Sequence, residues 1–220
     1  GPYSNAQATE ALLAEAQARD IPPQRIICTG DVVAYGGDPG KTVDLIRGAS
    51  VHVVMGNCEE AVGFGADDCG CGFEEESECA VWSRAWYAHA ADALDDDAKA
   101  WMRGLPRRLG FALAGRRFAV IHGGAENISE YIFASTPTEA KTRSFERLDR
   151  EDPPGEPVDG VIAGHSGLPF SAFPGHRLWH NAGAIGMPAN DSTARGWFSI
   201  LDPVGGGIDI TFYPLDYDHR

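Results

Sequence analysis

The sequence feature that most constrains the fold is a repeated design in which a short apolar run ends in glycine and a polar side chain. Four runs have this design, at residues 25–29, 51–55, 119–121 and 160–163. Their β-branched residues are typical of buried strands. In an open α/β sheet, side chains just past the carboxyl ends of strands converge on one crevice. Four polar residues should therefore meet there: Asp31, Asn57, His122 and His165.

These four side chains form a plausible ligand set for a metal ion. A carboxylate, an amide oxygen and two imidazoles suit a divalent transition metal. We therefore predict one such ion, manganese, iron or zinc, held by Asp31, Asn57, His122 and His165.

The remaining pattern predicts one α/β (α+β) domain over residues 1–220, a size that allows a sizeable core. Helices alternate with the early strands, which predicts parallel βαβ units. The expected helices cover 6–19, 39–47, 80–93, 95–103 and 138–149, and a hairpin covers 109–113 and 117–121. From residue 168 onward short strands follow one another without helices, so we expect this half to be antiparallel, at 168–173, 177–180, 196–201 and 208–213.

Charge and hydropathy exclude some partners. The net charge of −14 argues against a nucleic-acid backbone or an anionic membrane. No apolar run approaches the roughly 20 residues of a membrane span, and no signal peptide is visible. We therefore expect a cytoplasmic protein whose partner is a small molecule. The chain begins where a first strand should already have ended, so we expect a short preceding piece.

An excursion at about 63–79 is rich in glycine, acidic residues and cysteine, and we expect a long loop there. Cys69, Cys71 and Cys79 lie within it, and Cys58 lies shortly before it. Three interpretations stay open: free or disulfide-bonded thiols, a second thiolate-bound metal or iron–sulfur cluster, and a redox-active pair that includes Cys58. A reducing cytoplasm disfavours stable disulfides, which favours ligation by Cys69, Cys71 and Cys79.

The order of these motifs resembles that of the calcineurin-like metallophosphoesterase superfamily. It is most similar to the small bacterial branch with YfcE-like and diadenosine-tetraphosphatase-like proteins. The resemblance covers nearly the whole chain and implies an αββα sandwich, with mixed sheets and a two-metal phosphoesterase centre at the strand ends. The matching motifs are Gly30-Asp31, Gly56-Asn57-x-Glu59, His122-Gly123, Gly164-His165 and residues 181–186.

Carried over residue by residue, the resemblance is partial. All four ligands of the family's second metal position are present, as Asp31, Asn57, His122 and His165. The first metal position is degenerate. Its Asp-x-His pair is replaced by Gly1 and Tyr3, and its last histidine by Gly167. The histidine that contacts phosphate in the family is Cys58 here. The resemblance therefore implies a protein remodelled for one metal.

The leading hypothesis from the sequence is a metal-dependent hydrolase acting on a small phosphorylated substrate. In it Asn57 and Cys58 face the substrate, and Glu59 orients Cys58 or a water. Tyr3 is a phenolate ligand, a proton donor or a space-filler in the vacated position. One alternative is a catalytically silent binding or redox-sensing module that depends on metal and cysteine. Another is a metalloenzyme with non-phosphatase chemistry.

Overall fold

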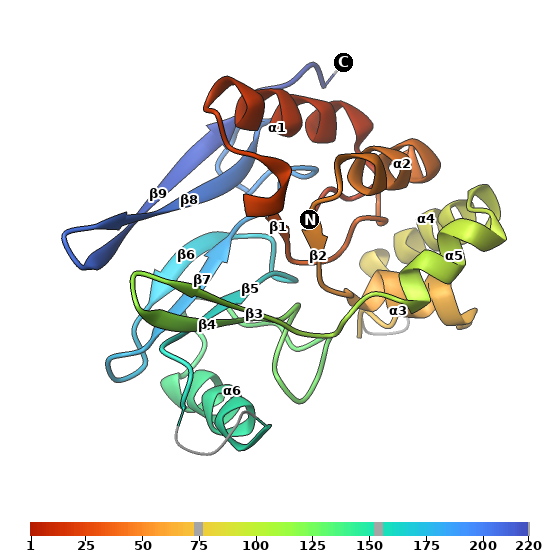
Figure 1. The fold of residues 1–220 in the computed structure, drawn as a ribbon. Coiled ribbons are helices and arrows are strands. Elements are labelled where there is room, and N and C mark those ends of the chain that lie inside the picture. The colour runs from red at the N-terminus through yellow and green to blue at the C-terminus, as the bar shows by residue number, and fades with distance from the viewer. Residues whose placement is uncertain (73–76, 152–155, 220) are drawn as a thin grey trace.

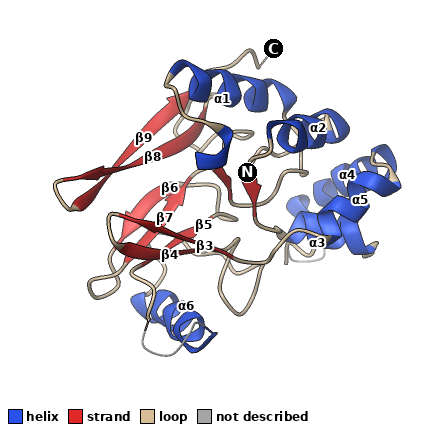
Figure 2. Cartoon of the chain, viewed as in Figure 1, coloured by secondary structure: helices blue, strands red, loops and turns tan. Residues whose placement is uncertain are grey.

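The computed structural model describes residues 1–72, 77–151 and 156–219, with the side chain of Cys79 outside the description. Six α-helices, one 3₁₀ turn and nine strands alternate along these residues (Figures 1 and 2). The helices are α1 (Ala6–Ala18), α2 (Pro39–Ala49), α3 (Asn57–Phe64), α4 (Glu78–Ala93), α5 (Asp96–Arg103) and α6 (Thr138–Glu151), with the turn η1 at Pro23–Arg25. The strands are β1 (Ile27–Cys28), β2 (His52–Val53), β3 (Leu109–Leu113), β4 (Arg116–Val120), β5 (Gly160–Ala163), β6 (Pro169–Ala172), β7 (Leu178–Ala182), β8 (Gly196–Val204) and β9 (Gly207–Leu215).

The described strands form three sheets. The central one has five strands in the order β3-β4-β5-β7-β6, while β1-β2 and β8-β9 are separate pairs. Strands β4, β5 and β7 run parallel, and β3 and β6 are antiparallel edges. The expectation of an antiparallel second half is confirmed for the pairs that strands after residue 168 form with one another, β6-β7 and β8-β9. Strand β7 also pairs in parallel with β5, which precedes that half. The chain passes to the edge strand β6 and returns as β7, which aligns β7 with β5.

The sheets pack as two β layers covered by helices. Helix α6 covers the outer face of the five-stranded sheet through Phe145 and Leu148, which pack with Val161 and Trp179. The inner face carries Val120 and packs against residues of the two smaller sheets, among them Ile27 and Ile208. Figure 1 shows α6 on one side of the β layers and α1 to α5 on the other. This arrangement confirms the predicted sandwich with mixed strand directions.

Several predicted boundaries differ from those observed. The strands expected at 25–29 and 51–55 are reduced to β1 and β2, two residues each, which pair in parallel. The excursion expected from residue 63 begins later, because helix α3, which was not predicted, ends at Phe64. Its other end is as expected, since α4 begins at Glu78. Helix α1 begins as predicted, with Asn5 Oδ1 accepting from the Ala8 amide at 2.9 Å.

None of the helices within the described ranges is both long enough and apolar enough to cross a membrane.

Candidate metal centre

The four polar side chains predicted at the strand ends do meet. His122 Nε2 lies 3.0 Å from Asn57 Oδ1, 3.1 Å from His165 Nδ1 and 3.3 Å from Asp31 Oδ2. All four residues are buried. Asp31 follows β1, Asn57 opens α3, and the two histidines follow β4 and β5. Ligand atoms of Asp31, His122 and His165 all lie within 4.8 Å of one another.

The atoms that converge are two acceptor oxygens and two imidazole nitrogens, the atom types that ligate a metal. His122 Nδ1 lies 2.6 Å from the Thr29 carbonyl oxygen. A carbonyl only accepts, so Nδ1 carries the proton and Nε2 presents a lone pair in the neutral ring. That lone pair faces a carboxylate, an amide oxygen and a second imidazole. Such atoms crowd together in this way when a cation or a shared proton lies among them, and this is the environment of a metal-ligating histidine.

Two further polar atoms at the centre support a cation. Within the described part of the chain, Asp31 Oδ1 and His165 Nε2 are buried without a hydrogen-bond partner. Buried polar atoms are ordinarily paired. Both residues also have left-handed backbone, with φ of +54° at Asp31 and +60° at His165. Such strain is typical of functional sites. The residues present therefore fit a divalent ion.

Electrostatics keep two of these side chains ready to bind a cation. Burial raises the pKa of Asp31, but the charge and hydrogen bond of His122 outweigh it and lower the pKa to about 2. Burial, reinforced by His122, lowers the pKa of His165 to about 4. Burial also lowers the pKa of His122, but Asp31 outweighs it and raises that pKa above its ordinary value. At neutral pH, Asp31 is therefore ionised and His165 is neutral, as metal ligation requires.

A hydrogen bond at the Nδ2 end of Asn57 fixes the orientation of its side-chain amide. Its Nδ2 donates to the Cys69 carbonyl oxygen at 2.8 Å. This contact distinguishes the two ends of the amide and turns Oδ1 toward His122. A segment twelve residues away in sequence therefore sets which atom Asn57 presents to the centre.

Glu59 binds the backbone on two sides of the centre. It is fully buried and accepts from the backbone amides of Asp31 at 2.8 Å, Gly56 at 2.9 Å and Val33 at 3.1 Å. The side chain therefore joins the segment after β1 to the start of α3. The orientation of Cys58 or a water by Glu59 stays a prediction.

Cys58 lies beside the centre as a neutral thiol. It is 2% exposed, and its Sγ lies 3.6 Å from Asn57 Nδ2. Burial, followed by the charges of Asp31 and Glu59, raises the pKa of Cys58 well above its ordinary value. The thiolate is the nucleophilic form of cysteine, and an adjacent cation would favour it, so a nucleophilic role of Cys58 would depend on the metal.

The three positions at which the resemblance loses ligands are neighbours in space. The Tyr3 amide donates to the Asp31 carbonyl oxygen at 3.0 Å, and the Tyr3 side chain is 5% exposed. A Cβ at Gly1 would lie 2.8 Å from the same oxygen, and one at Gly167 would lie 3.5 Å from Tyr3 Oη. Burial, then Asp31, raises the pKa of Tyr3 well above its ordinary value. Tyr3 is therefore a protonated phenol beside Asp31.

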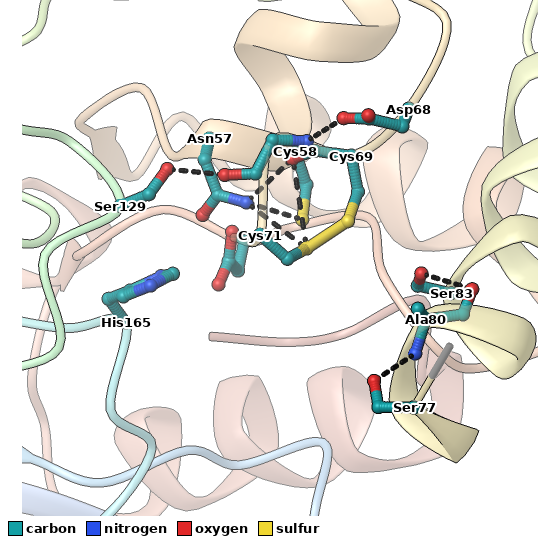
Figure 3. Close-up of a disulfide and its surroundings, with 12 residues drawn as sticks. Asn57, Cys58, Asp68, Cys69, Cys71, Ser77, Ala80, Ser83, Ser129 and His165 are labelled. Carbon is teal, nitrogen blue, oxygen red and sulfur yellow. Dashed lines mark hydrogen bonds between the residues drawn. A yellow bond between two sulfur atoms is a disulfide. The ribbon is translucent and has the colours of Figure 1, made fainter. Parts of the chain in front are cut away.

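Two cysteines of the excursion, Cys69 and Cys71, are not arranged as thiolate ligands. Cys69 and Cys71 form a disulfide, and both are 3% exposed. In this form neither offers a thiolate, so the structure differs from the expected metal or cluster at these two residues. Cys79 lies at the start of α4, and its side chain falls outside the described residues. Figure 3 shows the disulfide packed beside Asn57 and Cys58.

Sequence reasoning missed one loop at the centre. The Tyr131 ring packs on His165, with centroids 4.1 Å apart, and Ser129 lies two residues before it. This loop follows β4 without regular secondary structure. It carries no spacing that indicates a site. The only available signal was its proximity in sequence to His122.

Comparisons with known proteins agree with this geometry. The Calcineurin-like phosphoesterase superfamily domain matches residues 4–203. The uncharacterized protein MJ0912 of Methanocaldococcus jannaschii is 24% identical over 233 residues, covering 98% of this chain and 85% of that protein.

Two crystal structures have a similar fold. The hypothetical protein PH1004 of Pyrococcus horikoshii OT3 superposes with a TM-score of 0.78 at 16% identity, covering 100% of this chain and 86% of the other. A metallophosphoesterase from Sphaerobacter thermophilus superposes with a TM-score of 0.66 at 21% identity, covering 98% of this chain and 86% of the other. Given the match over residues 4–203, the chain belongs to the calcineurin-like phosphoesterase superfamily.

Proposed function

We propose that this protein is a hydrolase of small phosphoesters that uses a single divalent metal ion, held by Asp31, Asn57, His122 and His165. The observation that carries the proposal is the convergence of Asn57 Oδ1, His165 Nδ1 and Asp31 Oδ2 on His122 Nε2 within 3.3 Å. Membership of the phosphoesterase superfamily supports the reaction class.

A bound ion of manganese, iron or zinc would supply Lewis-acid polarisation of a phosphoryl oxygen. The chain's own residues prepare that position. Thr29 holds His122 in the tautomer that presents Nε2, and the Cys69 carbonyl turns Asn57 Oδ1 inward. In hydrolysis a water oxygen bonds to phosphorus, the ester P–O bond breaks, and the leaving oxygen takes a proton. The proton that the water releases would restore the group that donated it. Tyr3 retains its phenolic proton and is our candidate donor.

Net charge supports a small substrate. A chain of net charge −14 repels a long polyanion such as nucleic acid. A compact phosphoester carries fewer charges, which one cation at the centre can offset. We therefore propose a small phosphorylated molecule as substrate.

Activity on a generic aryl phosphate tests the proposal. Protein stripped of metal and reloaded with manganese should show weak turnover, and His122→Asn should abolish it. Turnover should be weak because Cys58 stands where the family has the phosphate-contacting histidine, and general acid–base help contributes roughly 10²–10⁴-fold. Cys58→His alone should not restore family-like turnover, since the first metal position remains degenerate. Rapid turnover by the wild type would contradict this, and so would equal turnover by His122→Asn.

One observation favours a second candidate, a metal-dependent binding module without hydrolysis. Tyr3 is buried beside Asp31, and Gly1 and Gly167 adjoin it. These residues stand where the family holds its other metal. Calorimetric titration of metal-loaded protein with inorganic phosphate and an uncleaved phosphodiester would separate the two functions. Tight binding without turnover of any tested ester favours the module.

A further inference from the structure

A small disulfide ring lies against the metal centre. Cys69 and Cys71 are joined across a single residue, Gly70. Gly70 has φ of +62°, a left-handed conformation that glycine adopts without a steric penalty. Figure 3 shows this ring next to Asn57, with Ser129 beyond Asn57 on the same side of the disulfide.

Two carbonyl groups of the ring support two different parts of the centre. The Cys69 carbonyl accepts from Asn57 Nδ2 at 2.8 Å, and the Gly70 carbonyl accepts from Ser129 Oγ at 2.6 Å. Two residues beyond Ser129, the Tyr131 ring packs on His165. The ring therefore contacts Asn57 directly and reaches His165 through one loop.

The disulfide sulfur also contacts Asn57. Cys71 Sγ lies 3.5 Å from Asn57 Nδ2, on the same amide nitrogen that bonds the Cys69 carbonyl. Both contacts place acceptors around the NH₂ end of the side chain. A flipped amide would direct Oδ1 at these acceptors, so the ring selects the orientation in which Oδ1 faces His122.

We propose that the Cys69–Cys71 disulfide is a redox-controlled clamp on the metal centre. The oxidised ring holds Asn57 and the 129–131 loop in the arrangement that binds metal, and reduction releases both. This regulation rests on the proposed function of the same site.

The chemical step is a thiol–disulfide exchange with an external dithiol. The dithiol supplies two electrons and two protons and becomes a disulfide. The Cys69–Cys71 bond breaks, and each residue becomes a thiol. Both sulfurs are buried, but Gly70 and Gly72 are exposed and the ring lies in a surface loop. Local opening of this loop would admit the reagent without unfolding the core.

Reduction should weaken metal binding because the freed loop samples more conformations. Binding must then order the Cys69 and Gly70 carbonyls, which the closed ring orders in advance. Outer-shell partners of metal ligands typically contribute 10–100-fold in affinity. We therefore expect the dissociation constant for metal to rise about tenfold or more on reduction.

The test compares zinc affinity of the full chain before and after treatment with a phosphine reductant, by competition with a chromophoric chelator. The matched control is the double variant Cys69→Ser/Cys71→Ser. It should bind zinc about as weakly as the reduced wild type and should not respond to the phosphine. Because wild-type reduction is reversible, reoxidation should restore affinity, so the result does not depend on the variant folding well.

Four outcomes would overturn the clamp. Mass spectrometry after alkylation could find Cys69 and Cys71 free in unreduced protein. Oxidised and reduced wild type could bind zinc equally, which refutes the clamp and leaves the proposed function standing. The reduced form could bind more tightly, which would make the thiols ligands. If oxidised wild type bound no metal at all, the proposed function would fail along with the clamp.

Discussion

At the scale of single residues, Glu59 holds the backbone of the metal centre although it is not one of the proposed ligands. Asp31 has left-handed backbone with φ of +54°, a conformation that costs a non-glycine residue of order 1–3 kcal/mol. The Asp31 amide is bound by Glu59, which also binds the amides of Val33 and Gly56. The strained residue is therefore held by a buried carboxylate whose other contacts lie on two separate segments.

Glu59→Gln tests this role. The amide NH₂ cannot accept from a backbone N–H, so a buried donor loses its partner. We expect the free energy of unfolding to fall by about 1–3 kcal/mol and metal affinity to fall with it. Urea denaturation gives the first value and chelator competition the second. The control is Glu60→Gln, on the same helix, whose surface ion pair with Arg107 should matter by under about 1 kcal/mol. Equal effects of the two substitutions would refute the role of Glu59.

At the scale of elements, the ends of β1 and β2 come together through two glycines. A Cβ at Gly30 would lie 2.8 Å from Gly56 Cα. A Cβ at Gly56 would lie 2.6 Å from the Asp31 amide nitrogen and 2.7 Å from Asp31 Oδ1. Real Cβ atoms do not tolerate such approaches to backbone. The segments that carry Asp31 and Asn57 therefore meet only because both positions lack a side chain.

Gly56→Ala should separate these segments. We expect a loss of about 1–3 kcal/mol in the free energy of unfolding, as for other overpacked sites, together with loss of metal binding. The matched control is Gly48→Ala in α2, where a Cβ would meet nothing within 4 Å. That change should be neutral or stabilising by up to about 1 kcal/mol, because alanine favours helix. Thermal unfolding of both variants decides the matter, and a Gly56→Ala protein as stable as wild type would contradict the account.

The same glycines explain which elements the sequence could predict. β-branched runs ending in glycine and a polar residue located Asp31, Asn57, His122 and His165 correctly at one edge. Helix α3 was missed because it is only eight residues long and its start is capped by Glu59 through Gly56 rather than by a recognisable cap residue. The contacts of the Ser129–Tyr131 loop were also beyond prediction, since they depend on tertiary packing.

Cysteine spacing left another question open. The spacing of Cys69, Gly70 and Cys71 is compatible with both a disulfide and a thiolate site, because the choice depends on oxidation state and neighbouring groups. The structure places a disulfide there. The resemblance of motif order located the family correctly. It carried no information about this ring, which lies at positions outside the motifs.

At the scale of the whole molecule, His180 joins two of the sheets. It lies on β7, fully buried, with Nδ1 2.9 Å from Ser171 Oγ on β6 and Nε2 2.7 Å from Ser199 Oγ on β8. Burial lowers the pKa of His180 to about 4. Between about pH 4 and the ordinary histidine pKa of about 6.5, the unfolded chain therefore binds a proton that the folded chain does not.

The free energy of unfolding should consequently fall as pH drops from about 6.5 to about 4, and this contribution should level off below. One site contributes at most about 3.4 kcal/mol over that window, at about 1.4 kcal/mol per pH unit. His180→Gln should reduce the slope of the free energy of unfolding against pH by up to the equivalent of one bound proton. His219→Gln in the exposed tail should leave that slope unchanged. His165 adds a slope of the same sign in metal-free protein, so only the difference between variants isolates His180. Unfolding by urea at pH 7 and pH 5 measures this pH dependence of the free energy of unfolding. Identical slopes in wild type and His180→Gln would rule out the contribution of His180.

The central claim, one metal ion per chain at the strand ends, is tested most directly by elemental analysis. Protein stripped of metal, saturated with manganese or zinc and separated from excess should hold one equivalent, and His122→Asn should hold none. The selective loss at Gly1, Tyr3 and Gly167, with all four other ligands retained, predicts this value. Two equivalents per chain, with ions about 3.5–4 Å apart as in two-metal phosphoesterase centres, would contradict the account, as would an equivalent that survives His122→Asn.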